Sequence, residues 1–352
     1  MNKRVNQALH IIEKDNLEAF LFSNPINITY LTGFREAEGY LLLNRDKIIY
    51  FTNFIYAQEA NKIKTWCLKT ISSNMFEQII KTIKKMGIKK VGFEEKHLSY
   101  LEYKKFKECA LKEHIFFLPK ESPAERMRMI KTKKEISLIK KAIHITKDAL
   151  LFAREIKDHY AREKDLQTEI IRFLHLKNGS SPSFNPIVAF NKNSSFVHHI
   201  PTEEYSQTNK IVLIDLGARY YGYCADLTRV FFSDKMPLSL KKIFDIVRKA
   251  QQLAIDKIKE GIKAKEVDKA ARAFIDKKGF GKYFGHGLGH GIGLNVHEKP
   301  FVNHNSSTVL KSGMVITIEP AIYLPGKFGI RVEDMVLVKR NKAEILSGTI
   351  NW

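Results

Sequence analysis

Three histidines lie close together among five glycines in the segment FGHGLGHGIGLNVHEKP, which ends at Pro300. They are His286, His290 and His297. Neutral imidazole is a common ligand of first-row metals, and glycine lets backbone and ligand approach closely. The segment therefore predicts a metal or substrate site. Two other interpretations stay open at this point: ordinary packed histidines, or a glycine-rich phosphate loop, although no Gly-Lys-Ser/Thr follows.

Acidic residues follow apolar runs at several places in the second half of the chain. The run 211–214 leads to Asp215, and after a tight return the chain reaches Asp226. The run 315–318 leads to Glu319, and residues 330–332 lead to Glu333. A buried carboxylate is costly unless it is paired, hydrogen-bonded or metal-bound. For the first pair the alternative is a turn-capping aspartate and a surface pair of Asp226 with Arg229.

Taken together, these acids and one of the histidines form a plausible ligand set for two divalent ions that share bridging ligands. Ligation by oxygens, one imidazole and no thiol favours Mn(II), Co(II) or Fe(II), with Zn(II) as an alternative. The proposed metal ligands are Asp215, Asp226, His290, Glu319 and Glu333. The three cysteines have no CxxC spacing, which indicates reduced thiols.

The first 120 or so residues alternate short apolar runs with amphipathic patterns, which predicts an α/β domain. This part has no dense cluster of ligand-type residues, so we assign it to recognition or oligomerisation. The expected strands are 19–22, 41–43, 48–51 and 91–93, and the expected helices are centred on residues 9–12, 79–86 and 100–111.

A connector is expected at 118–123, which divides the chain into domains 1–122 and 123–352. A capping box of Thr132 and Glu135 predicts the start of a long helix. Further helices are expected at 166–177, stopping at Gly179, and at 238–260 and 267–278; these helices would cover one face of a sheet. Strand-like runs at 187–189, 211–216, 223–232, 314–318 and 331–338 predict an α+β domain with a mainly antiparallel sheet.

The composition is that of a globular protein, with 44% hydrophobic and 28% charged residues in a chain of 352. No apolar run approaches the length of a membrane span, so we expect a cytoplasmic protein with no membrane partner. The net charge of +21 would favour nucleic acid, but the lysines are spread along the chain. We read 81–90 and 263–278 as solvated helix faces and expect no nucleic-acid partner.

Five blocks of the sequence resemble the pita-bread metallopeptidases, in particular the Xaa-Pro branch of prolidases and aminopeptidases P (M24-type). The amino-terminal block is Asn27-x-x-Tyr30-Leu31-Thr32-Gly33-Phe34. The other four are the segment 183–201, DLGARYYGYCADLTR, GHGIGLNVHEKP and EPAIYLPGKFGIRVED. The resemblance implies a pita-bread catalytic domain preceded by a smaller α/β creatinase-type domain, a homodimer, and hydrolysis of an Xaa-Pro bond in dipeptides or short peptides.

The resemblance also implies roles for individual residues. Asp215 and Asp226 would bind one metal ion, His290 and Glu319 the other, and Asp226 and Glu333 would bridge them. Glu319 would shuttle a proton from water to the leaving nitrogen. His297 would contact the scissile carbonyl and His198 the proline end of the substrate. His286 would line the pocket, Arg331 would orient a carboxylate or meet the substrate carboxylate, and Tyr323 would support these groups.

Two alternatives share the same fold. One is a catalytically inactive module that binds nucleic acid or protein; the other is a metal-free, creatinase-like amidinohydrolase. Both types of relative lack several of the four acids and one histidine that are present here. Two positions depart from the family pattern, since Asn191 and Ala321 stand where relatives often have glycine. Neither is a metal ligand. The motifs do not separate a dipeptidase from an aminopeptidase.

Overall fold

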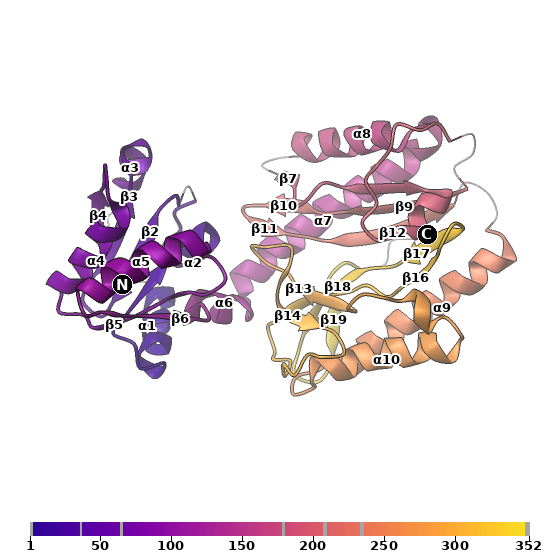
Figure 1. The fold of residues 1–352 in the computed structure, drawn as a ribbon. Helices are drawn as coiled ribbons and strands as arrows, with labels where there is room; N and C mark the ends of the chain where they lie inside the picture. Colours follow the sequence, from indigo (N-terminus) through magenta and orange to yellow (C-terminus); the bar gives the residue numbers. More distant parts are fainter. Residues whose placement is uncertain are drawn as a thin grey trace. The chain divides into compact units, whose positions relative to one another are not determined.

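A computed structural model describes residues 3–35, 37–63, 66–177, 180–206, 210–232 and 236–348. The chain divides into two compact units, Met1–Arg128 and Met129–Trp352 (Figure 1). Each unit has its own hydrophobic core. No disulfide joins the three cysteines. None of the helices in the described ranges has the length and hydropathy needed to cross a membrane.

The first unit is an α/β domain built on a six-stranded mixed sheet with the order β4-β3-β2-β1-β5-β6. Antiparallel β2 and β3 form the expected hairpin, whereas β1, β5 and β6 run parallel. The strands are β1 Ala19–Phe22, β2 Tyr40–Asn44, β3 Ile48–Thr52, β4 Cys67–Thr70, β5 Lys90–Glu94 and β6 Phe116–Lys120. The helices are α1 Lys3–Lys14, α2 Pro25–Thr32, α3 Phe54–Ala60, α4 Met75–Lys85, α5 Tyr100–Lys112 and α6 Pro123–Arg128.

The residues expected to form a connector have regular structure. Leu118 and Pro119 belong to β6, and Pro123 begins α6. Proline is tolerated in β6 because this strand lies at the edge of the sheet, where a backbone donor can be spared. Proline at the first position of α6 is also favourable, since the first turn of a helix has no acceptor for that donor.

The second unit carries most of the strands and four long helices. The helices are α7 Lys133–Ile156, α8 Glu163–Leu176, α9 Leu238–Lys257 and α10 Ala264–Lys277, with short 3₁₀ turns η1 Lys157–His159, η2 Asn191–Ser195 and η3 Gly281–Tyr283. The first strands are β7 Ser180–Pro182, β8 Ile187–Phe190, β9 Ile211–Leu216, β10 Ala218–Tyr220, β11 Tyr223–Cys224 and β12 Leu227–Phe232. The later strands are β13 Gly289–Gly291, β14 Glu298–Val302, β15 Val315–Ile318, β16 Ala321–Leu324, β17 Phe328–Arg331, β18 Asp334–Val338 and β19 Ala343–Ile345.

The strand pairs of this unit are antiparallel, which confirms the α+β prediction. The capping box of Thr132 and Glu135 starts α7 as expected. Helix α8 ends at Leu176, and its expected stop at Gly179 lies outside the described residues.

The prediction that these helices cover one face of a single sheet was wrong. The strands form several small sheets, with the orders β11-β10-β7, β12-β9-β8, β14-β13-β15-β18-β19 and β16-β17. Helices α7 and α8 pack on β7, β8 and β10, whereas α9 and α10 pack on β14, β15 and β17. Figure 1 shows the two helix pairs on opposite sides of the strands. Apolar residues of α9 and α10 share one buried core with those of β15 to β18.

Two runs predicted as single strands are each interrupted at an acidic residue. The run 223–232 breaks between β11 and β12, where Ala225 and Asp226 are not paired in a strand. The run 331–338 breaks between β17 and β18, at Val332 and Glu333. Neither break contains a glycine or a proline, so the sequence does not mark it as the end of a strand.

Candidate metal centre and substrate cavity

Each proposed metal ligand lies in or at the end of a strand of the second unit. Asp215 lies near the end of β9, and His290 is the middle residue of β13. Asp226, Glu319 and Glu333 occupy gaps between consecutive strands. The residue before His290 must be glycine for β13 to pack against β15. A Cβ on Gly289 would lie 1.9 Å from the Thr317 carbonyl oxygen.

The structure brings all five of these residues together. The ligand atoms of Asp215, Asp226 and Glu333 lie within 4.8 Å of one another, and so do those of His290, Glu319 and Glu333. A third such group contains Asp226, His290 and His297, so the cluster also reaches a histidine that was expected only on the substrate side. Asp226, His290 and Glu333 each belong to two of these groups, so the three groups form one continuous cluster.

One oxygen of each of three carboxylates is buried without a hydrogen-bond partner among the described residues. These are Asp215 Oδ1, Asp226 Oδ1 and Glu333 Oε1. Leaving a buried charged acceptor unpaired is costly, and buried polar groups are normally satisfied. The donor set of four carboxylates and imidazole matches hard to intermediate divalent cations. The residues present therefore fit a metal cluster.

The protonation state of the His290 ring gives the most specific evidence for a cation site. Its Nδ1 lies 3.1 Å from the Gly291 carbonyl oxygen, which can only accept, so Nδ1 carries the proton. Burial lowers the pKa of His290 to about 4, and the ring is therefore neutral at pH 7. Its Nε2 lone pair then faces Glu319 Oε1 at 3.4 Å and Asp226 Oδ2 at 3.7 Å. The neutral ring therefore directs a lone pair at two carboxylate oxygens, and a cation at the cluster would satisfy all three groups.

Burial and mutual repulsion both raise the pKa values of the carboxylates. Burial raises the pKa of Asp226 well above its usual range, and the charges of Glu333 and Asp215 raise it further. Burial likewise raises the pKa of Glu333, with Glu319 as the next cause, and raises that of Glu319 to about 8. A cation at the cluster opposes each of these effects because it favours the ionised carboxylates.

A chain of hydrogen bonds fixes the carboxylates from behind. Arg331 Nη2 donates to Asp215 Oδ2 at 2.7 Å, and its Nη1 donates to the Tyr323 hydroxyl at 2.7 Å. Thr228 donates to Glu333 Oε2 at 2.8 Å and accepts from Arg331 Nε at 3.0 Å. Tyr323 and Arg331 are both buried. Arg331 thus contacts a carboxylate of the cluster directly.

His286 extends the same chain. Its Nε2 lies 3.2 Å from the Tyr323 hydroxyl, and its Nδ1 lies 2.8 Å from the Gly287 carbonyl oxygen. Burial lowers the pKa of His286 to about 4, so the ring is neutral at pH 7 and its Nε2 accepts a hydrogen bond from the Tyr323 hydroxyl. The ring also lines the cavity in front of the carboxylates.

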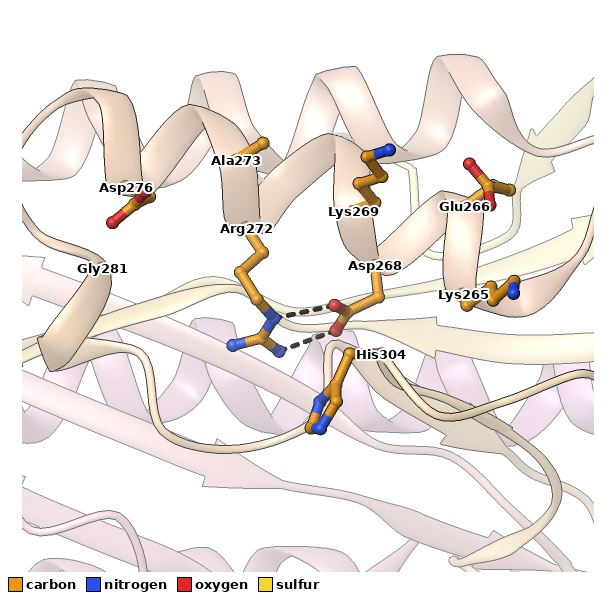
Figure 2. Close-up of a pocket in the computed structure, with 9 residues that line it drawn as sticks. All are labelled: Lys265, Glu266, Asp268, Lys269, Arg272, Ala273, Asp276, Gly281 and His304. Carbon is orange, nitrogen blue, oxygen red and sulfur yellow. Dashed lines mark hydrogen bonds and ion pairs between the residues drawn. The ribbon is translucent and has the colours of Figure 1, made fainter.

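The backbone beside His286 is held by an ion pair on α10 (Figure 2). Arg272 donates through Nε and Nη2 to the two carboxylate oxygens of Asp268, at 2.7 Å each. The same guanidinium donates to the carbonyl oxygens of Phe284 and His286, at 2.9 and 2.8 Å. It thereby fixes the start of the segment that carries the histidines.

A cavity of about 500 Å³ opens in front of the carboxylates. Its lining includes all five proposed ligands together with His198, His286, His297 and Arg331. The His297 ring lies edge-on to the His290 ring, with centroids 4.3 Å apart. His198 and His297 are both exposed, and within the described ranges no hydrogen bond or ion pair joins His198 to the carboxylates. Buried carboxylates therefore line the inner part of the cavity, and the exposed imidazoles of His198 and His297 line its rim.

The alternative in which Asp226 forms a surface pair with Arg229 does not hold. Arg229 is 1% exposed and pairs with Asp334 at 2.6 Å. Asn191, where relatives often have glycine, has a φ of 48°. Asparagine tolerates this left-handed conformation better than most residues, which explains how the departure is accommodated.

Three residues that support the site were missed from the sequence. Gln251 of α9 donates to the carbonyl oxygens of Ile318 and Val332, one residue before Glu319 and Glu333. Glu163 of α8 accepts from the backbone of Phe190 and Thr202 and from the His199 ring, beside His198. Thr228 lies in the DLTR block but was not singled out. A polar residue on an otherwise apolar helix face is a signal for Gln251, although a weak one.

Comparison with known proteins agrees with this geometry. Residues 137–340 match metallopeptidase family M24, and residues 4–130 match the creatinase/prolidase N-terminal domain. The chain is 34% identical to the Xaa-Pro dipeptidase of Pyrococcus horikoshii over 354 residues, which cover 99% of this chain and 98% of the relative.

Two solved structures are similar over nearly the whole chain. The Xaa-Pro dipeptidase from Bacillus anthracis has a TM-score of 0.93 at 31% identity and covers 99% of this chain and 98% of its own. The X-Pro aminopeptidase from Thermotoga maritima has a TM-score of 0.86 at 30% identity, with coverages of 96% and 97%. These matches confirm the pita-bread fold with its smaller α/β domain, and the chain belongs to metallopeptidase family M24, among the prolidase-like enzymes with a creatinase/prolidase N-terminal domain.

Proposed function

We propose that this protein hydrolyses the Xaa-Pro bond at the amino terminus of dipeptides or short peptides, and that it needs two divalent metal ions, Mn(II) or Co(II), to do so. The observation that carries the proposal is the cluster of facing acceptors at His290 Nε2, Glu319 Oε1 and Asp226 Oδ2. The names of the similar dipeptidases and aminopeptidase support the choice of bond. A homodimer belongs to the same proposal, from likeness to the family.

Five residues would hold the ions: Asp215 and Asp226 one of them, His290 and Glu319 the other, with Asp226 and Glu333 shared. When bound, such ions act as Lewis acids that acidify water and polarise a carbonyl group. Arg331 and Thr228 hold the outer oxygens of Asp215 and Glu333, so the inner oxygens keep their direction toward the cluster.

Glu319 is the residue that would move the proton. Its Oε1 lies within reach of His290, and Thr317 donates to the same oxygen at 3.4 Å. A carboxylate can accept a proton as a general base and release it again as a general acid. In hydrolysis Glu319 would take the proton of the attacking water and transfer it to the proline nitrogen as the carbon–nitrogen bond breaks.

The imidazoles at the rim would position the substrate. His297 would donate a hydrogen bond to the scissile carbonyl oxygen, where negative charge develops in the transition state. His198 would contact the proline end. The X-Pro bond is a tertiary amide without an N–H, so a site that recognises the ring itself serves it better than one that binds extended backbone.

The inactive binding module remains the alternative, but no observation favours it. All five proposed ligands are retained and converge, whereas an inactive module has no need for buried, unpartnered carboxylate oxygens.

The test is metal analysis combined with activity. The chain is freed of metal, loaded with Mn(II) or Co(II), analysed for bound metal, and assayed on Ala-Pro and Ala-Pro-Pro. We expect about two ions per chain and metal-dependent release of alanine. Absence of both bound metal and turnover would refute the proposal.

A further inference from the structure

A second cavity adjoins the first one on the far side of His198. Its volume is about 430 Å³, and it shares Asn185, Ile187 and His198 with the metal-site cavity. We call this second cavity the α8 groove. The residues that it adds include Lys164, Gln167 and Ile171 of α8 and Ile200 and Pro201 of the facing loop. The two cavities are therefore adjacent, with His198 in the lining of both.

The walls of the α8 groove are tied together by hydrogen bonds. Gln167 Nε2 donates to the Pro186 carbonyl oxygen at 2.7 Å, and the Lys164 backbone N–H donates to the Thr202 carbonyl oxygen at 3.1 Å. Glu163 accepts from Thr202 N at 2.9 Å and pairs with His199 at 2.7 Å. The groove therefore exists before any ligand enters it.

The surface of the α8 groove suits a peptide. Ile171, Ile187 and Pro186 supply apolar lining, and Ile200 is 82% exposed at its edge. Lys164 lies at one side, where its Nζ pairs with Glu203 at 3.3 Å; both side chains are more than half exposed. An exposed pair of this kind contributes little, so a substrate carboxylate can replace Glu203.

The metal-site cavity itself offers little to the carboxylate of a bound dipeptide. Among the described residues that line it, Arg331 is the only lysine or arginine. Its guanidinium already donates to Asp215, Tyr323, Thr228 and the Val197 carbonyl oxygen. Four of its five N–H groups are thus engaged, and the side chain is buried.

We propose that the α8 groove binds the residues that follow proline, and that the preferred substrates are tripeptides and longer peptides with proline in second position. The inference rests on the proposed function. The enzyme would cleave after the first residue, so a longer substrate extends only on the carboxyl side of proline. A groove next to the metal-site cavity can bind that part of the peptide. Lys164 then pairs with the carboxylate of a tripeptide.

The experiment compares kcat/KM of the Mn(II)-loaded full chain on Ala-Pro, Ala-Pro-Ala and Ala-Pro-Ala-amide. We expect Ala-Pro-Ala to exceed Ala-Pro by about tenfold, because binding energy from the added residue is used in the transition state. In Lys164→Glu the ratio of Ala-Pro-Ala to Ala-Pro falls by about fivefold, and Ala-Pro-Ala-amide is affected less because it lacks the carboxylate. In Ile200→Ala the ratio falls for both tripeptide forms by about threefold.

Lys241→Glu is the matched control. Lys241 forms an equally exposed pair with Asp245 at 2.9 Å on α9, and it does not line the α8 groove. This variant should leave the ratio unchanged. Leu-Pro is a second control, because a groove that instead held the side chain of the first residue would alter the Leu-Pro to Ala-Pro ratio in Ile200→Ala.

The outcomes separate the two proposals. Turnover of Ala-Pro with tripeptides cleaved more slowly, or a ratio that Lys164→Glu and Ile200→Ala leave unchanged, overturns the α8 groove assignment while the Xaa-Pro activity stands. A change confined to the Leu-Pro ratio also overturns it. Failure to cleave any of the substrates in metal-loaded protein removes the proposed function and this inference together.

Discussion

Asp226 is buried and lies close to two other carboxylates of the cluster. It is 5% exposed, one of its oxygens has no partner among the described residues, and Glu333 and Asp215 both raise its pKa. Asp226→Asn keeps the shape but removes one charge. We expect metal affinity to fall by about a hundredfold, since a ligand is lost.

The same substitution has an opposite effect on the metal-free protein. The folded state disfavours ionised Asp226, so removing the charge should raise the Tm of metal-free protein by about 2–4 °C. Metal titration and thermal unfolding measure the two effects. Asp245→Asn, at an exposed position of α9, is the control and should change neither. A metal-free variant less stable than wild type would contradict the account of the cluster as mutually repelling carboxylates.

Glu163 is a second single residue with a testable effect, because its contribution to the free energy of unfolding depends on pH. Burial alone would raise its pKa, but hydrogen bonds from His199, Phe190 N and Thr202 N outweigh burial and lower it. The ionised form is therefore bound more strongly in the folded state. Its stabilisation is complete above the unfolded pKa of about 4.3 and is lost as the pH falls through the lower folded value.

Glu163→Gln should consequently reduce the free energy of unfolding by about 2 kcal/mol at pH 7. The difference from wild type should shrink as the pH falls below about 4, where the wild-type carboxyl becomes protonated. Urea unfolding at pH 7 and pH 3.5 measures it. Glu169→Gln, at a surface pair on the same helix, should show neither effect. A difference that grows toward acid pH would be inconsistent with the lowered pKa.

At the scale of elements, α9 holds together the two chain segments that lead to Glu319 and Glu333. Gln251 is 2% exposed, and its amide donates to Ile318 O at 3.0 Å and Val332 O at 3.1 Å. One side chain thus fixes the spacing of two chain segments, each one residue before a proposed ligand. Gln251→Leu leaves both carbonyl groups without this donor.

We expect Gln251→Leu to cost about 2–4 kcal/mol of stability and to weaken metal binding by about tenfold. Denaturant unfolding and metal titration measure the two losses. Gln252→Leu is the control: Gln252 bonds only to exposed Asp256 among the contacts seen here, so both quantities should stay close to wild type. Loss of stability with unaltered metal affinity would show that Gln251 supports the fold but does not position the carboxylates.

Much of this arrangement follows from the sequence at the level of elements. Apolar runs and the capping box of Thr132 and Glu135 predicted most helices and strands, and the acids after those runs predicted the cluster. The breaks at Asp226 and Glu333 were not predicted, because no glycine or proline marks them in the sequence. The role of Gln251 was not predicted either, since its acceptors are backbone groups that become neighbours only in the folded chain.

At the scale of the whole molecule, the lysines that make the chain basic lie apart from the proposed metal ligands. The lysines of 81–85 and 263–278 are exposed on α4 and α10, as solvated faces. The proposed metal ligands all belong to Met129–Trp352, and the core of Met1–Arg128 is a separate cluster around β1, β5 and α5. Each unit should therefore have its own unfolding transition, and only one of the two should respond to metal.

We expect calorimetry of the full chain to show that Mn(II), at about a hundred times its dissociation constant, raises one transition by about 5–10 °C and leaves the other in place. Phe106→Ala assigns them: Phe106 is fully buried in the first unit, so its removal should cost about 3–5 kcal/mol and lower only the metal-insensitive transition. Val247→Ala, in the core of the second unit, should lower only the metal-sensitive one. A single transition that metal and both substitutions shift together would show that the two units unfold as one cooperative body.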